Sequence, residues 1–406
     1  MEQIRKNVLA QLDMTREHEE EELLAAIDEE ICREAKQRVI PLNWRRELRM
    51  QVFHSLRKLD VLQELLNEDD ISEIMVNGAD HIFYEKKGEM IAWNRSFSSQ
   101  EKLEDIIQQI VGSHNRVINA AEPIADTRLA DGSRVNVVLP PIALEGPVVS
   151  IRKFPRHPLR MEDLIAKGSI SEECAAFLRT LVEAGYNIFI SGGTGSGKTT
   201  FLNALSAFIP KSERVITIED SAELQIRGVE NLVRLETRNA GAEGTLAITV
   251  RDLIRTALRM RPDRLIVGEI RGAECLDMLQ AMNTGHDGSL STGHANSSQD
   301  MISRMETMVL MGMEMPLTAI RSQIAAGVDV LVHLGRLRDK SRRMLSIMEV
   351  DGIEQGEIRL HPLYEFAEMG EGEEGQIVGR WEKKGELIHK GKLYAAGLGD
   401  PCRRGK

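Results

Sequence analysis

The residues with the clearest capacity for chemistry lie in a glycine-rich turn between an apolar run and a helical pattern. Ile188, Phe189 and Ile190 lead into a segment of the form G-x-x-x-x-G-K-T, and Phe201–Leu205 continues with helical spacing. Glycines let the backbone turn so that successive N–H groups surround an anion, and the following helix points the positive end of its dipole at the same place. The predicted phosphate loop consists of Gly192, Gly193, Thr194, Gly195, Ser196, Gly197, Lys198, Thr199 and Thr200.

Two side chains of this loop suit a nucleoside triphosphate. Lys198 can reach the β- and γ-phosphates, and the hydroxyl of Thr199 can ligate Mg²⁺. The alternative is a flexible Gly/Ser loop, which requires neither the strand pattern before the turn nor the helix pattern after it, and both are present. We therefore expect the protein to bind ATP and Mg²⁺.

Two further strand-like runs end in carboxylates. Val215–Glu219 ends in a glutamate, and the apolar run that begins at Arg264 reaches Glu269. Ligands collect at the carboxyl edge of a parallel sheet, so both acids are expected near the phosphate loop. We predict that Glu219 activates the attacking water and that Glu269, in a Walker B pattern, lies near Mg²⁺, directly or through water. Glu269 remains the alternative general base. The structural alternative for Glu219 is a solvated strand end, and that for Glu269 is a buried core strand with an incidental acid.

A stretch dense in small residues, Gly285–Asn296, contains His286 and His294. A single histidine is more often structural than catalytic. Two histidines within a Gly/Ser/Thr strand-to-loop segment favour sensing of the γ-phosphate, and we assign that role to His294. The sequence does not decide which ring nitrogen faces the phosphate.

Composition limits the classes of function. The chain of 406 residues has a net charge of −11, which disfavours sequence-independent nucleic-acid binding by the whole surface. No apolar run approaches the ~18–20 residues that span a bilayer, and the first residues lack a signal peptide's apolar stretch, so we expect a cytoplasmic protein. The cysteines are far apart and indicate neither a zinc site nor a disulfide framework: Cys32, Cys174, Cys275 and Cys402. One basic stretch is interpreted as a solvated hairpin rather than a nucleic-acid patch: Arg336, Arg338, Lys340, Arg342 and Arg343.

The first part of the chain changes its hydrophobic period at Asn67. We expect a helical module over 1–66, including a helix over 17–40 and a second periodic segment over 52–66, then an α+β domain over 67–154 and a linker over 155–165. The expected strands of the α+β domain are 73–76, 81–84, 127–129, 134–139 and 148–152, with a helix over 100–112.

From 166 to 366, helix and strand patterns alternate around the phosphate loop, which predicts an α/β domain with a mainly parallel sheet covered on both faces. The expected strands are 187–191, 214–219 and 264–268, the helices 171–184, 198–208, 248–260 and 299–309, and the hairpin strands 328–334 and 344–350. Residues 367–406 are rich in Gly and Glu and are predicted to form a loosely ordered tail.

Taken together, these segments resemble the secretion ATPases of the type II/type IV secretion superfamily, and within it the CpaF-type motor of Tad/Flp pilus assembly. The four boxes of that family occur in order: Walker A at Gly192–Thr199, the Asp box at Thr217–Glu223, Walker B at Leu265–Glu269 and the His box at Gly285–Asn296. The subfamily resemblance also rests on Leu258–Arg264, Met282–His286 and Ile74–Gly78. It covers roughly residues 20–365.

This resemblance implies a RecA-like P-loop ATPase domain in a homohexameric ring, in which the preceding α+β domain helps close the nucleotide site. Family members supply arginines from that domain, and Arg134 and Arg152 fit those positions best here. Arg128 is a weaker candidate, and surface arginines on strands are the structural alternative. The family's pilus-extension branch often has a tetracysteine zinc site, so the cysteine spacing favours the zinc-free branch.

The resemblance further implies a motor at the inner face of the cytoplasmic membrane. It would work with an inner-membrane platform protein to power assembly of a Tad/Flp-type pilus or protein secretion, contacting the membrane only through partners. Two other functions remain open. One is an ATP-gated assembly scaffold with little hydrolysis. The other is a nucleic-acid translocase, which the net acidity disfavours.

Overall fold

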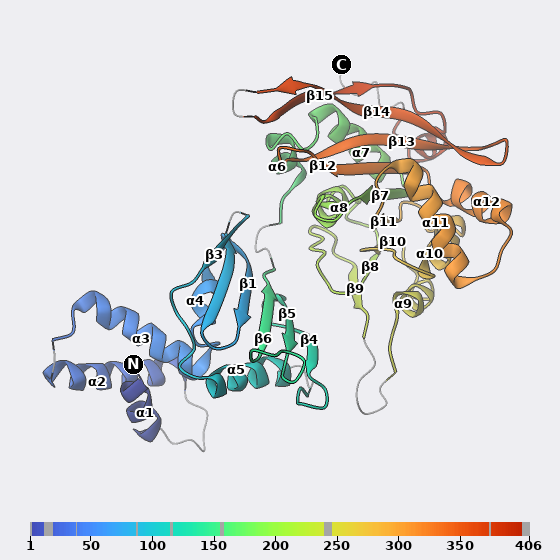
Figure 1. Ribbon diagram of the computed structural model, residues 1–406. Coiled ribbons are helices and arrows are strands. Elements are labelled where there is room, and N and C mark those ends of the chain that lie inside the picture. The colour runs from blue at the N-terminus through green and yellow to red at the C-terminus, as the bar shows by residue number, and fades with distance from the viewer. Residues whose placement is uncertain are drawn as a thin grey trace. The chain divides into compact units, whose positions relative to one another are not determined.

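The computed structural model describes residues 2–11, 19–37, 39–86, 88–113, 117–154, 158–238, 246–372 and 375–399. The chain divides into two compact units, Met1–Arg156 and His157–Lys406 (Figure 1). Across the described ranges, no helix is both long enough and apolar enough to cross a bilayer.

The first unit begins with helices α1 (Glu2–Gln11), α2 (Glu20–Gln37) and α3 (Leu42–Arg57). Their apolar faces form one core, which consists of Ile4, Val8, Leu23, Ile27, Ile31, Leu48, Val52 and Phe53. The helix expected over 17–40 is therefore confirmed as α2 in its described part, while α1 was not predicted.

A short helix, α4 (Leu62–Asn67), separates these helices from the sheet of the first unit. The expected periodic segment over 52–66 is interrupted before it, where Asp60 adopts a left-handed φ of 52°. Leu62, Leu65 and Leu66 pack into the core of the sheet rather than that of the helices. We therefore propose that the helical module ends before α4 rather than at residue 66.

Six antiparallel strands form the sheet in the described part of the first unit, in the order β3-β2-β1-β6-β5-β4. They are β1 (Ile71–Asn77), β2 (His81–Lys86), β3 (Glu89–Ala92), β4 (Ile124–Arg128), β5 (Arg134–Val138) and β6 (Val148–Arg152). Helix α5 (Gln100–Gly112) begins at an N-cap, where Ser99 accepts a hydrogen bond from the backbone N–H of Lys102. The strands and helix expected here are confirmed, and β3 was missed.

The second unit is built on a mixed sheet. In the described residues it has nine strands in the order β15-β14-β13-β12-β7-β11-β10-β8-β9. Five of the eight pairings are parallel and the three at the β13–β15 side are antiparallel. The strands are β7 (Ile188–Gly192), β8 (Val215–Glu219), β9 (Leu232–Glu236), β10 (Arg264–Val267), β11 (Leu290–Gly293), β12 (Val330–Arg336), β13 (Arg342–Glu354), β14 (Glu357–Glu371) and β15 (Ile377–Lys383).

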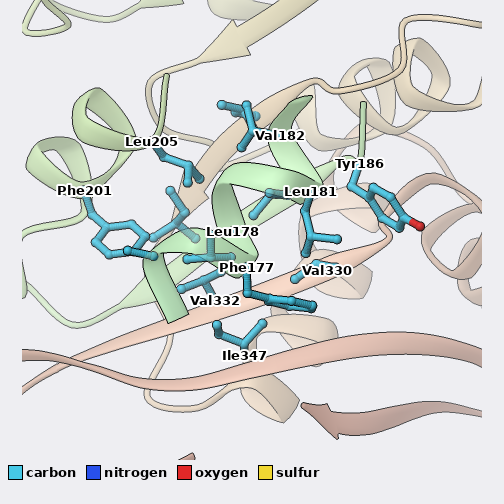
Figure 2. Packing of buried hydrophobic residues seen from close by; sticks show 14 of the residues in the cluster. Phe177, Leu178, Leu181, Val182, Tyr186, Phe201, Leu205, Val330, Val332 and Ile347 are labelled. Atoms are coloured by element: carbon cyan, nitrogen blue, oxygen red, sulfur yellow. The ribbon is translucent and has the colours of Figure 1, made fainter. Parts of the chain in front are cut away.

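Successive side chains of a strand point to opposite faces of the sheet, so a strand that is buried throughout presents apolar side chains on both faces. Helices cover both of these faces. Ile188 and Ile190 of β7 join one core with α6 (Met161–Ala166), α7 (Glu172–Glu183) and α8 (Lys198–Ser206). Figure 2 shows the α7 side chains Phe177 and Leu178 near Val330, Val332 and Ile347, with Phe201 and Leu205 of α8 in another part of the same core. Phe189 joins the other core, with α9 (Val250–Ala257), α10 (Glu274–Asn283), α11 (Ser298–Gly312) and α12 (Leu317–Gly327). The mainly parallel α/β sheet covered on both faces is confirmed.

The prediction of a loosely ordered tail over 367–406 is wrong for its described residues. Strand β14 continues to Glu371, β15 pairs with it, and α13 (Gly391–Ala395) follows. Trp381 donates a hydrogen bond from Nε1 to the carbonyl oxygen of Met344 at 2.7 Å, and Leu387 and Leu393 are buried. The few apolar residues of this polar segment are thus placed where the sheet edge and the α7 core can bury them. Residues 373, 374 and 400–406 lie outside the described residues.

The expected linker over 155–165 is also corrected in part. Residues 155–157 lie outside the described residues, but α6 occupies the second half of the range. Met161 and Leu164 of this helix are buried in the α7–α8 core. The helix was missed because six residues carry too short a pattern for a periodicity to be visible.

Candidate nucleotide-binding site

The phosphate loop connects a fully buried strand to a helix. All five residues of β7 are buried, and α8 begins at Lys198 after the left-handed N-cap residue Gly197. Gly195 and Gly197 have φ angles of 72° and 92°, which L side chains rarely adopt. A Cβ on Gly192 would lie 2.5 Å from the carbonyl oxygen of Leu334 and from Ser196 Oγ. The glycines at these positions are therefore required by backbone conformation and by close packing.

The side chain of Lys198 lies within the loop. Its Nζ donates hydrogen bonds to the carbonyl oxygens of Gly192 and Gly193, both at 3.1 Å, and lies 3.2 Å from Nδ1 of His294. Burial lowers the pKa of Lys198, and the nearby Arg271 lowers it further, while Glu269 acts in the opposite direction. An anion bound in the loop would therefore accept the hydrogen bonds that the ammonium group now donates to these two carbonyl oxygens.

His294 connects Lys198 to the Walker B glutamate. Its Nε2 lies 2.6 Å from Oε1 of Glu269, and burial lowers the pKa of the imidazole. An ammonium group can only donate, so Nδ1 must accept from Lys198 and the ring proton must be on Nε2, facing Glu269. Nδ1 is thus the nitrogen on the side of the phosphate loop, and Nε2 is on the side of Glu269.

Glu269 has a second partner, Arg271, which lies two residues further along the chain. Nη2 of Arg271 donates to Oε2 of Glu269 at 2.5 Å, and Nη1 lies 3.8 Å from Oδ2 of Asp220. Sequence reasoning gave Arg271 no role, although an acid and a base two residues apart after a strand is a visible pattern. Oε2 of Glu269 therefore accepts a hydrogen bond from Arg271, whereas Oε1 lies close to His294 but has no hydrogen-bond partner among the described residues.

Glu219 has a different environment. Its Oε1 accepts hydrogen bonds from the backbone N–H groups of Glu223 and Leu224, at 2.8 and 2.9 Å. Its Oε2 is buried and has no hydrogen-bond partner among the described residues. Burial raises the pKa of this carboxyl group to about 7. A Cβ on Gly268 would lie 2.9 Å from Cγ of Glu219, so the residue before Glu269 must be small for Glu219 to keep its position.

The sheet order brings these groups to one edge. Strand β11 lies between β7 and β10, and β8 follows β10, all in parallel. The residues that end these strands or follow them therefore meet at the carboxyl edge: Lys198, His294, Glu269 and Glu219. The hydroxyl groups of Ser291 and Thr292 donate to the carbonyl oxygens of Val267 and Gly268, at 2.9 and 2.8 Å, and hold the ends of β11 and β10 together.

The structure separates the two histidines of the His box. His294 directly follows β11, whereas His286 precedes this strand and so lies at the opposite edge of the sheet. Nδ1 of His286 lies 3.3 Å from the carbonyl oxygen of Ala281, a contact at the end of α10. Only one of the two histidines is thus brought to the phosphate loop.

The candidate arginines lie in the first unit, in a single row across its sheet. Arg134 is the cross-strand partner of Arg128 on one side and of Arg152 on the other. Glu73 follows Arg152 in the same row. Arg134 and Arg152 are exposed, and the row therefore combines three arginines with one carboxylate.

The site residues fit the phosphates of a nucleotide with a bound Mg²⁺. Ser196 Oγ, like Glu219 Oε2, is buried without a hydrogen-bond partner among the described residues. Buried polar atoms are normally satisfied, so their orphaned state at this edge indicates that a ligand or water completes the site. Thr199 lies in the first turn of α8, and its hydroxyl is of the kind that ligates a metal ion bound to phosphates.

Comparison with known proteins identifies the family. The model of the "Type II/IV secretion system protein" family matches residues 55–369. A putative conjugal transfer protein of Mycobacterium tuberculosis is 36% identical over 293 residues, which cover 71% of this chain and 83% of that protein. The type IV secretion system protein PtlH of Bordetella pertussis is 32% identical over 324 residues, covering 73% and 95%. The solved structure of the Legionella pneumophila ATPase DotB has a similar fold, with a TM-score of 0.51 and 21% identity over 72% of this chain and 80% of that one. The protein therefore belongs to the type II/IV secretion system protein family.

Proposed function

We propose that this protein is an ATPase motor that powers assembly of a Tad/Flp-type pilus or protein secretion across the inner membrane. The observation that carries the proposal is the continuous set of contacts Lys198–His294–Glu269–Arg271 at the phosphate loop. These contacts join the loop to the Walker B acid at the sheet edge where Glu219 also lies. A γ-phosphate that binds to Lys198 would therefore also change the contacts of His294 and Glu269.

Each residue has a defined task in this proposal. Lys198 and the loop N–H groups bind the β- and γ-phosphates, and Thr199 and Glu269 orient the metal ion, the latter directly or through water. Mg²⁺-bound ATP supplies the phosphoanhydride bond that is hydrolysed. Glu219 accepts a proton from the attacking water at its unpartnered Oε2. Its raised pKa, about 7, places the proton affinity of this base near working pH.

Glu219 is favoured over Glu269 as the general base because burial raises the pKa of its carboxyl group to about 7. Oε2 of Glu269 accepts a hydrogen bond from Arg271, and Oε1 lies 2.6 Å from Nε2 of His294. Each glutamate keeps one buried oxygen without a hydrogen-bond partner among the described residues, Oε2 in Glu219 and Oε1 in Glu269. His294 would sense the γ-phosphate through its contact with Lys198, because an anion in the loop competes for the same ammonium group.

The motor is proposed to be a homohexamer in which Arg134 and Arg152 complete the site and neutralise developing charge on the phosphate. Support comes from the resemblance of the four boxes and from the arginine row in the first unit. Loss of the γ-phosphate would then release contacts that hold two domains together, which is a common basis of nucleotide-driven motion.

The transport role is supported by the relatives: PtlH is a type IV secretion system protein, and the mycobacterial relative is a putative conjugal transfer protein. The Tad/Flp assignment rests on the resemblance of Leu258–Arg264, Met282–His286 and Ile74–Gly78 to the CpaF-type motor. We place the motor at the inner face of the cytoplasmic membrane, bound to an inner-membrane platform protein.

The test is ATP turnover against protein concentration, with the mass of the assembly determined at each concentration. The proposal expects turnover per subunit to rise as a ring assembles and to vanish in Lys198→Ala. Lys167→Ala is a matched control, because this lysine is exposed at the end of α6. Tight ATP binding with negligible turnover in every assembled state would support the scaffold, and stimulation by single-stranded DNA or RNA would support the translocase.

A further inference from the structure

The hairpin of β12 and β13 lies beside the phosphate loop. Strand β12 pairs in parallel with β7, and its residue Leu334 is the partner of Gly192, the first residue of the loop. The hairpin continues beyond this pair and carries the basic stretch of the sequence. This hairpin therefore runs beside the loop, and its basic residues lie outside the four family boxes.

The cations of this hairpin differ in their contacts. Arg338 in the turn donates hydrogen bonds to Glu368 at 2.7 Å and to Glu371 at 2.8 Å on β14. Arg343 lies over the ring of Phe366 at 5.1 Å and donates to the carbonyl oxygen of Ile377 at 2.6 Å. These two arginines hold the hairpin to the last two strands. Their contacts correct the expectation of a fully solvated hairpin.

Arg342 points to the phosphate loop instead. A Cβ built on Gly197 would lie 3.5 Å from Cδ of Arg342, so the stem of this arginine passes directly over the last glycine of the loop. Arg342 is exposed, and no carboxylate among the described residues is within ion-pair distance of it. Its cross-strand partner is Arg336, another arginine. Two like charges directly opposite each other are unfavourable unless an anion approaches them.

The sheet order indicates which end of a nucleotide lies near Arg342. Strands β11, β10 and β8 lie on one side of β7 and carry the residues assigned to the γ-phosphate and the water. Strands β12 and β13 lie on the other side. Arg342 is therefore on the side of the loop away from the bond that is hydrolysed.

We propose that Arg342 binds the α-phosphate of the nucleotide from β13 and orients the nucleoside end of the ligand. This inference rests on the proposed function and extends it to a residue outside the four boxes. A guanidinium group suits the task, because its planar N–H groups can contact two phosphate oxygens at once. Arg342 is a binding residue for nucleotides in general and does not distinguish ATP from ADP.

The experiment measures binding of ATP, ADP and inorganic tripolyphosphate, each with Mg²⁺, by titration calorimetry. The variants are Arg342→Gln, Arg342→Lys and the matched control Lys340→Gln, which removes one exposed positive charge from the same hairpin. We expect Arg342→Gln to weaken all three ligands by about tenfold, and by equal factors, which is typical for loss of a charge-assisted hydrogen bond at an accessible site. Arg342→Lys should recover part of the affinity because the charge remains.

The thermal midpoint of the ligand-free Arg342→Gln variant shows whether any loss of affinity is merely structural. Removing one of two opposed arginines should leave the midpoint unchanged or raise it. Affinity equal to that of Lys340→Gln would overturn the proposal. Weaker binding of ATP alone would also overturn it, because this result indicates a contact with the γ-phosphate. So would weaker binding of ATP and ADP with unchanged binding of tripolyphosphate, because this result indicates a contact with the base or the ribose. If the wild-type protein bound no nucleotide, the proposed function itself would fail, and this assignment with it.

Discussion

Arg134 on β5 lies directly opposite Arg152 on β6, and Arg128 on β4 extends the same row. These residues come from three strands separated along the chain by turns and loops, and only the register of the sheet places them together. Glu73 on β1 is the partner of Arg152 on its other side, so the row combines three arginines with one carboxylate.

The arginine row allows a test of a site shared between subunits. We expect Arg152→Ala and Lys198→Ala to be nearly inactive when assayed separately, with turnover lowered by about 10³-fold or more. Mixed in one ring, they should recover part of the activity, because some interfaces then combine an intact lysine with an intact arginine. Turnover of the mixture is the measurement.

A mixture that stays as inactive as its components would show that each subunit uses its own arginine, or none. Arg46→Ala is the control, because this arginine is exposed on α3 of the same unit and outside the row. Mixing it with Lys198→Ala should give no more activity than the Arg46 variant contributes.

Glu219→Gln should bind ATP but hydrolyse it about 10²- to 10⁴-fold more slowly, the range attributed to a general base. In the wild type, turnover should rise with pH through about 7, because burial raises the pKa of Glu219 to that value and only its ionised form accepts a proton. The pH dependence of turnover and a nucleotide-binding assay check both parts. If Glu219→Gln retained wild-type turnover, the base would be reassigned to Glu269.

The same pKa predicts an effect on stability. The folded protein holds the proton of Glu219 more tightly than the unfolded chain, whose pKa is near the ordinary 4.5. This stabilising contribution is complete below pH 4.5 and is lost as the pH rises through about 7. Glu219→Gln, neutral at every pH, should therefore exceed the wild type in unfolding free energy at pH 8 by up to about 3 kcal/mol, but not at pH 4.5. Glu230→Gln, at an exposed position, should show no such pH-dependent gain.

His294→Ala should lower turnover by about tenfold to a hundredfold and change nucleotide affinity much less, because Lys198 and the loop N–H groups remain. Its loss removes the link between Lys198 and Glu269, at 3.2 and 2.6 Å. His286→Ala is the matched control from the same box, since it lies at the opposite edge of the sheet and should retain wild-type turnover. Equal losses in both variants would contradict the assignment of the sensing role to His294 alone.

The C-terminal segment should contribute to the stability of the second unit. Leu393 is fully buried, whereas the adjacent Tyr394 is 66% exposed. Leu393→Ala should lower the free energy of unfolding by about 2–5 kcal/mol, while Tyr394→Ala should lower it by less than about 1 kcal/mol. Chemical denaturation monitored at Trp381 on β15 measures both. An unaffected Leu393 variant would mean that α13 does not pack as described.

Local signals in the sequence were sufficient for the phosphate loop and for the strand and helix that flank it, β7 and α8, whereas β9, β11, α10 and α12 were not among the expected elements. The glycines report backbone conformations that other residues rarely adopt, and the apolar runs report burial through their period. These signals act within a few residues, so Gly195, Gly197, Lys198 and the two acidic strand ends were found without knowledge of the fold. Their chemical roles remain predictions.

Tertiary structure alone decided how these pieces meet. The placement of β11 between β7 and β10 is a long-range pairing that no local period encodes, and it sets His294 between Lys198 and Glu269 while leaving His286 at the other edge. The same holds for Arg342 over Gly197 and for the strands of the C-terminal segment, which looked disordered by composition. Burial and strand register depend on residues that are distant in the chain, and for this reason the sequence determined the chemical groups of this protein but not their arrangement.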